Sequence, residues 1–130
     1  LGFEARIGAR IEPEVSLPAG GQGAVGIEFR ADDKRIASLL QPLNHKPTAD
    51  CVTAERAVVR VLDGGCDVPI ASYAVVEGEE FWLRALVGSV DGHTLLTAQG
   101  LGVDPEALGR QVAETLLESG AAAILEAVRG

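Results

Sequence analysis

The sequence predicts an α+β fold, with a three-stranded antiparallel sheet and helices packed on one of its faces. Three alternating runs, separated by short glycine-containing turns, predict the strands over residues 70–76, 80–87 and 94–99. In the middle run every second side chain is apolar, so one face of the sheet is fully hydrophobic. Amphipathic segments before and after the runs are typical of helices that cover such a face. We therefore expect residues 45–130 to form one C-terminal domain.

The predicted helices of this domain have recognisable ends. Thr48 can cap a helix that continues to Leu62, where two glycines follow and end it. After the sheet, Asp104 precedes a proline at the first position of a second helix. Gly120 ends or kinks that helix, and residues 121–129 continue as a final amphipathic segment.

The chain before this domain is predicted to contain remnants of neighbouring α/β domains. Residues 1–23 are predicted to be a helix end and a Gly-rich hinge, because apolar residues at helical spacing give way to three glycines within four residues. Residues 24–44 are predicted to be a strand at 24–30 and a short helix that Asp32 or Asp33 can cap. The apolar face of this helix is predicted to consist of Ile36, Leu39, Leu40 and Leu43, and Pro42 and Pro47 are predicted to end it. The chain contains no methionine and opens inside amphipathic structure, which predicts an incomplete protein.

Composition excludes several classes of function. The net charge is −8, from 19 acidic and 11 basic residues without a basic cluster, which argues against nucleic acid or an anionic membrane as partner. No apolar run approaches the roughly 20 residues of a membrane span. Two cysteines do not make a disulfide framework, which favours a reducing, cytoplasmic compartment. The possible metal ligands are Cys51, Cys66, His45 and His93. No metal site is predicted, because no two of them form a closely spaced pair in the sequence.

Residues Gly21–Gly26 match the G-x-G-x-x-G pattern of dinucleotide-binding proteins. That pattern binds a pyrophosphate when it follows a strand and opens a helix. Here the following residues alternate like a strand, so we interpret the segment as a flexible hinge.

Cys66 is the strongest candidate functional residue. It follows two glycines and precedes an aspartate, in a predicted loop with few apolar neighbours in the sequence. From the residues alone, an exposed functional thiol and a buried structural thiol are about equally supported. Asp63, Asp67 and the negative end of the preceding helix favour the protonated thiol, so we expect slow alkylation of Cys66. Cys51, in the first turn of the predicted helix, is expected to be a packed side chain.

Four segments carry a resemblance to a known family, in the same order along the chain. They are Ser16–Glu28 (SLPAGGQGAVGIE), Leu43–His45 (LNH), Thr53–Ala57 (TAERA) continued by Gly64–Pro69 (GGCDVP), and Phe81–Gly88 (FWLRALVG). They resemble hydroxymethylbilane synthase, also called porphobilinogen deaminase. The resemblance implies a C-terminal portion only, because the family's N-terminal half, with its catalytic aspartate and most substrate-binding arginines, has no counterpart here. No catalytic residue is therefore assigned in this chain.

The resemblance implies that Cys66 holds a dipyrromethane cofactor through a thioether. Four porphobilinogen units are added to that primer with loss of ammonia, which gives the linear tetrapyrrole hydroxymethylbilane. Gln22 and Gly23 are implied to bind near the cleft, where the chain crosses back toward a missing first domain. The whole protein is expected to be a monomeric transferase, with porphobilinogen, the growing pyrrole chain and the missing N-terminal domains as partners.

Arg56 and Arg60 are further cofactor-binding candidates. They lie four residues apart on one predicted helix face, and guanidinium groups pair with carboxylates such as those of pyrroles. The alternative from the residues is a solvated face paired with Glu55.

Two other functions stay open. One is a stand-alone α+β ligand-binding or regulatory module in which Cys66 is incidental. The other is a cysteine-dependent enzyme, which needs a base that the sequence does not show beside Cys66. The isolated chain is expected to be inactive, and its apolar segments around Ile7, Ile27 and Leu39 favour self-association.

Overall fold

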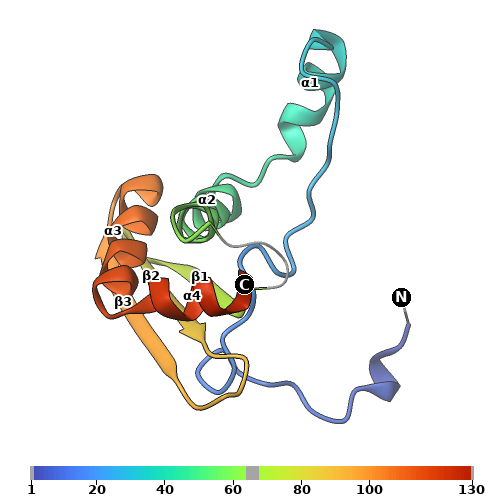
Figure 1. The fold of residues 1–130 in the computed structure, drawn as a ribbon. Helices are drawn as coiled ribbons and strands as arrows, with labels where there is room; N and C mark the ends of the chain where they lie inside the picture. The colour runs from blue at the N-terminus through green and yellow to red at the C-terminus, as the bar shows by residue number, and fades with distance from the viewer. Residues whose placement is uncertain (1, 64–67, 130) are drawn as a thin grey trace.

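The computed structural model describes residues 2–63 and 68–129 of the chain. Its body is a three-stranded antiparallel sheet, in the order β1-β2-β3, with helices on one face (Figure 1). The strands are β1 (Ile70–Glu77), β2 (Glu80–Gly88) and β3 (Leu95–Gly102). This arrangement confirms the predicted α+β fold.

The helical layer consists of α2 (Lys46–Val61), α3 (Pro105–Glu118) and α4 (Ala121–Arg129). The start of α3 is as predicted, because the Asp104 carboxylate accepts a hydrogen bond from the Ala107 amide at 2.9 Å. Gly120 separates α3 from α4 with a φ of 103°, a left-handed conformation that glycine adopts without strain.

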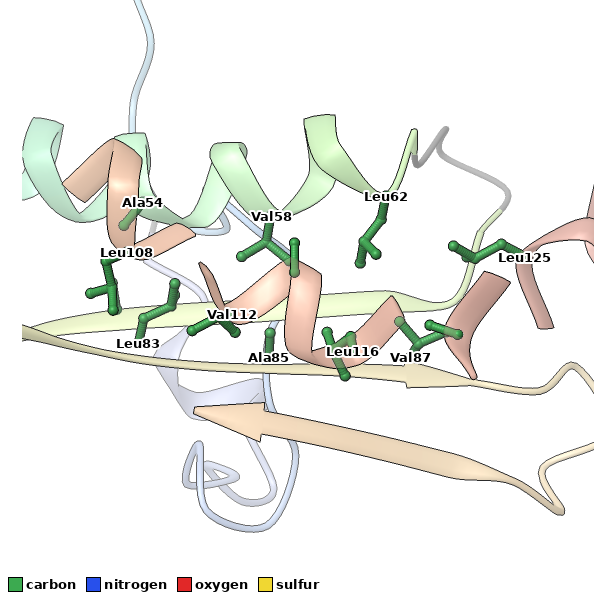
Figure 2. Close-up of a cluster of buried hydrophobic side chains, with 13 residues drawn as sticks. Ala54, Val58, Leu62, Leu83, Ala85, Val87, Leu108, Val112, Leu116 and Leu125 are labelled. Atoms are coloured by element: carbon green, nitrogen blue, oxygen red, sulfur yellow. The ribbon is translucent and has the colours of Figure 1, made fainter. Parts of the chain in front are cut away.

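The core lies between the helical layer and the sheet (Figure 2). Leu83, Ala85 and Val87 of β2 are buried on the helix side, as their alternation predicts, and Phe81 packs partly against the same cluster. The helices contribute Ala54, Val58, Leu62, Leu108, Val112, Leu116 and Leu125.

β3 was predicted over 94–99 but continues through Gly100 and Gly102. A Cβ on Gly100 would lie 3.0 Å from Leu108 Cδ1 and 3.2 Å from Val112 Cγ2. The glycine therefore lets α3 approach the sheet. In the sequence the same residue resembles a turn signal, which is why the end of the strand was missed.

The start of α2 differs from the prediction. The helix begins at Lys46 instead of after a Thr48 cap, and Pro47 lies in its first turn instead of ending the preceding segment. Proline suits that position because its φ is already helical and its missing amide needs no acceptor. The Thr48 hydroxyl contacts His45 Nδ1 at 2.8 Å.

Residues 24–44, here called the arm, extend away from the body (Figure 1). The predicted strand over 24–30 does not form, since these residues are exposed and take part in no ladder of the described sheet. Alternation produces a strand only where a neighbour supplies the backbone hydrogen bonds. The predicted helix end over residues 1–11 is likewise reduced to one short turn, η1 (Glu4–Arg6).

The short helix of the arm is confirmed in part. Asp33 caps α1 (Lys34–Leu40) by accepting a hydrogen bond from the Ile36 amide at 3.0 Å, and η2 (Gln41–Leu43) follows. Its predicted apolar face covers no core, because Leu39 is 61% exposed.

We predict that Gly109→Ala destabilises the body by about 1–3 kcal/mol, because overpacking outweighs the helix propensity of alanine. Gly109 lies where α3 meets α2, and its Cβ would be only 2.3 Å from the Ala54 carbonyl oxygen. Urea unfolding followed by circular dichroism measures the change. Gly26→Ala is the matched control, since nothing lies within 4 Å of that position. Equal unfolding midpoints for the two variants would contradict the prediction.

Candidate functional site

Glu55 connects three parts of the structure through one buried carboxylate. The residue lies on α2 and is 5% exposed. Its Oε2 accepts a hydrogen bond from the Gly21 amide at 2.6 Å, and its Oε1 accepts one from the Ala74 amide on β1 at 2.8 Å. Burial raises the pKa of this carboxyl above its ordinary value, and the two amide hydrogen bonds only partly oppose that shift.

The segment that reaches Glu55 wraps around the edge of the sheet. Residues 13–21, here called the strap, begin on the face opposite the helices, where Glu14 pairs with Arg84 at 2.9 Å. Farther along, the Pro18 carbonyl accepts a hydrogen bond from the Ser72 amide on the free edge of β1 at 3.0 Å. The strap therefore passes from the outer face of the sheet to the edge of β1 before it meets α2.

Gly20 and Gly21 have packing roles in the strap. A Cβ on Gly20 would lie 2.7 Å from the Ser72 hydroxyl oxygen, so a larger residue would push the strap off β1. Gly21 has a φ of 78°, which orients its amide toward Glu55 without strain. The conformational freedom predicted for the glycine-rich segment is thus restricted at these two positions.

A groove of about 340 Å³ lies beside Glu55, between residues 22–24, α2 and the end of β1. Gln22 and Gly23, two of the predicted cofactor-binding residues, line it together with Cys51. Burial raises the pKa of the Cys51 thiol, and the charges of Glu55 and Asp50 add to that shift. Cys51 is therefore a protonated, partly buried thiol, in agreement with a packing role.

Cys66, the predicted attachment residue, lies outside the described residues. The structure does describe the residues on either side of 64–67. α2 ends at Val61, and Asp63 has a left-handed φ of 49°, so the left-handed residue after the helix is an aspartate where the sequence suggested a glycine. Leu62, before residues 64–67, is buried, and Val68, after them, packs against the core. The described residues on both sides of Cys66 are therefore anchored in the core.

Arg56 and Arg60 lie on the exposed side of α2. Arg60 Nη2 is 2.6 Å from Glu106 Oε2 in the first turn of α3, and both side chains are about half exposed. Such a pair contributes little to stability and its partner can be exchanged. Neither arginine pairs with Glu55, whose carboxylate points instead to the strap and β1.

The predicted site residues that the structure describes do not all lie together. Gln22 and Gly23 lie against Pro47, Cys51 and their neighbours in the first half of α2. Cys66 follows the other end of that helix, and the ten residues from Cys51 to Val61 rise about 15 Å. Among the described residues, the end of α2 at Val61 is therefore well separated from Gln22 and Gly23.

No group of acidic, histidine or cysteine side chains in residues 2–63 and 68–129 is arranged to bind a metal ion. His93 lies in the turn between β2 and β3, with its Nδ1 2.9 Å from the Asp91 carbonyl oxygen. In the same part of the chain, no helix is long and apolar enough to cross a membrane.

Two protein-family models match the chain. The model described as "Porphobilinogen deaminase, C-terminal domain" matches residues 49–118, which is more than half of the chain. The chain belongs to the porphobilinogen deaminase family. A second model, "Porphobilinogen deaminase, dipyromethane cofactor binding domain", matches residues 1–38, which include the strap and the first part of the arm. Dipyrromethane is thus the cofactor of this porphobilinogen deaminase chain, and Cys66 lies inside the C-terminal match.

Glu55 is the important residue that the sequence analysis did not identify as part of a site. A signal was present, because Cys51, Glu55, Val58 and Leu62 share one face of α2 at helical spacing. A carboxylate in an otherwise apolar stripe requires hydrogen-bond donors from elsewhere. Pattern analysis cannot say that these donors are backbone amides from two distant segments.

We predict that the stability of the wild type relative to Glu55→Gln declines as the pH rises. Burial raises the pKa of Glu55 in the folded chain from its ordinary value of 4.5, so folding favours the protonated form. The relative stability is greatest below the ordinary pKa and decreases as the pH passes through the folded value. Urea unfolding of both proteins at several pH values measures it. A difference that stays constant over this range would rule out the predicted linkage.

Proposed function

We propose that this chain is the cofactor-carrying part of a hydroxymethylbilane synthase and that Cys66 is the attachment residue. The observation that carries the proposal is the family match over 49–118 together with the motif Gly64–Pro69 inside it. When bound, dipyrromethane supplies the primer to which four porphobilinogen units are added with loss of ammonia. The residues that flank 64–67 support the proposal, because Leu62 is buried in the core and Val68 packs against it.

The residues of this chain fit an acidic pyrrole cofactor in one respect. Arg56 and Arg60 are exposed on the helix that leads to Cys66, and the ion pair of Arg60 with Glu106 lies at the surface. We propose that these two guanidinium groups bind acetate or propionate groups of the pyrroles. Gln22 and Gly23 are proposed to contact the far end of an extended pyrrole chain from the groove.

We further propose that Cys66 acts in attachment and that the proton-transfer groups come from outside this chain. In the described residues, the buried carboxylate of Glu55 is held by two backbone amides, and the thiol of Cys51 has a raised pKa. The isolated chain is accordingly inactive. The complete protein is proposed to be a monomeric cytoplasmic transferase that binds porphobilinogen and neither nucleic acid nor membranes.

A dipyrromethane adduct on Cys66 tests the proposal. Intact-mass measurement and peptide mapping of the chain, produced together with the rest of its protein, should show the adduct in the wild type. Cys66→Ser should lack it, because the oxygen of serine is a much weaker nucleophile than sulfur. Cys51→Ser is the matched control and should keep it. An unmodified wild type would favour the alternative, a stand-alone ligand-binding or regulatory module.

Alkylation of the unmodified chain gives a second test. In the Cys51→Ser variant, Cys66 should react with iodoacetamide at neutral pH far more slowly than an activated cysteine of a hydrolase. Asp63 and the negative end of α2 disfavour the thiolate that alkylation requires. A free-cysteine peptide and a papain-type enzyme provide the reference rates. Labelling as fast as that enzyme would support a cysteine-dependent enzyme instead.

A further inference from the structure

The arm leaves and re-enters the body at one place. Its first residue, Ala24, lines the groove beside Gln22 and Gly23, and the chain returns through Pro47 and Thr48, which line the same groove. The arm itself is largely exposed and packs on no core in the described residues (Figure 1). Residues 22–24 and 47–48, here called the arm base, therefore set the direction of the arm.

The base is held to the body by Glu55. Gly21, the last residue of the strap, donates its amide to one carboxylate oxygen, and the next residue along the chain already lines the groove. The second oxygen accepts the Ala74 amide on the free edge of β1, where a further strand would otherwise supply the acceptor. One side chain thus fixes the arm base, α2 and β1 at a single spacing.

The chemistry of this link requires a carboxylate. Each oxygen accepts one N–H, so both must be acceptors at the same time. A glutamine of the same shape has one oxygen, and its NH₂ group would face an amide donor. A protonated carboxyl likewise has an O–H donor, which would face one of the two amide donors.

Few other charges act on Glu55. On α2, the Cys51 thiol is the titratable neighbour of Glu55, and the partly buried Asp50 also acts on that thiol. The other polar side chains that line the groove nearby, Gln22 and Thr48, carry no charge. From β1, Tyr73 is the titratable neighbour that lines the groove.

We propose that Glu55 is a positioning residue for the reaction: it locks the arm base to α2 and β1 and so orients the arm relative to the domain that carries Cys66. This inference rests on the proposed function only in its second half, the link to the reaction. Its first half concerns the geometry of this chain and is tested without cofactor.

Amide hydrogen exchange of the ¹⁵N-labelled chain tests the geometric half. In Glu55→Gln, the protection of the Gly21 or Ala74 amide should fall at least about tenfold, because one acceptor is lost. Core amides at Leu83 and Val112 should stay within about twofold of the wild type. Glu106→Gln, which removes an exposed carboxylate on α3, is the matched control and should leave all four amides unchanged.

The pH dependence of amide protection at Gly21 and Ala74 separates a positioning role of Glu55 from a general effect on stability. In the wild type, protection of these two amides should fall as the pH is lowered and Glu55 is protonated, whereas Glu55→Gln should show no such step. Retained protection in Glu55→Gln, equal loss at the core amides, or identical pH profiles of the two proteins would overturn the inference.

The complete protein tests the second half. Glu55→Gln should keep the adduct on Cys66 but form tetrapyrrole at least about tenfold more slowly at saturating porphobilinogen, because the arm is misplaced. An unchanged rate with lost amide protection would overturn the role in the reaction. A wild type without adduct would instead overturn the proposed function, while the exchange result would still decide the role of Glu55 in the chain.

Discussion

The buried carboxylate of Glu55 is the constraint on which the arrangement of this chain depends. The strap comes from the face of the sheet opposite the helices. α2 belongs to the helical layer, and β1 is the edge strand of the sheet. Glu55 is the point at which the three meet, with one oxygen at 2.6 Å from the Gly21 amide and the other at 2.8 Å from the Ala74 amide. The cost of burying a charge at this position is visible in the raised pKa of the group. Such a cost is tolerated because each oxygen satisfies a backbone donor that has no strand beside it.

The parts of the fold that could be predicted are those whose signals are local. Alternation located β1 and β2 and the buried face of the middle strand, and the pair Asp104 and Pro105 located the start of α3. The strand expected at 24–30 was wrong because alternation does not supply a partner. The start of α2 was wrong because Pro47 can open a helix as well as end one. Local chemistry decides local structure, and pairing across long distances has to be observed.

The candidate site was predicted less completely than the fold. Family membership and dipyrromethane are established by the matches, but the role of Cys66 stays a prediction because the residue lies outside the described part of the chain. Gln22 and Gly23 line the groove beside the first half of α2, and Arg60 faces α3 on its exposed side. The predicted ligands thus occupy separate regions around one helix. Spacing in the sequence gave no indication of this separation, because the strap reaches α2 only by passing around the sheet.

The ion pair of Glu14 with Arg84, on the face of the sheet opposite the helices, has a practical consequence. Trp82, the single tryptophan of the chain, has the Arg84 guanidinium 4.2 Å from its ring centre, and that guanidinium is held by Glu14 of the strap. A cation fixed over an indole ring shifts its emission, so the fluorescence of the native protein reports whether the strap is seated. The molecule therefore carries an intrinsic optical probe for the attachment of the segment that leads into the arm, and no external label is needed to follow it in solution.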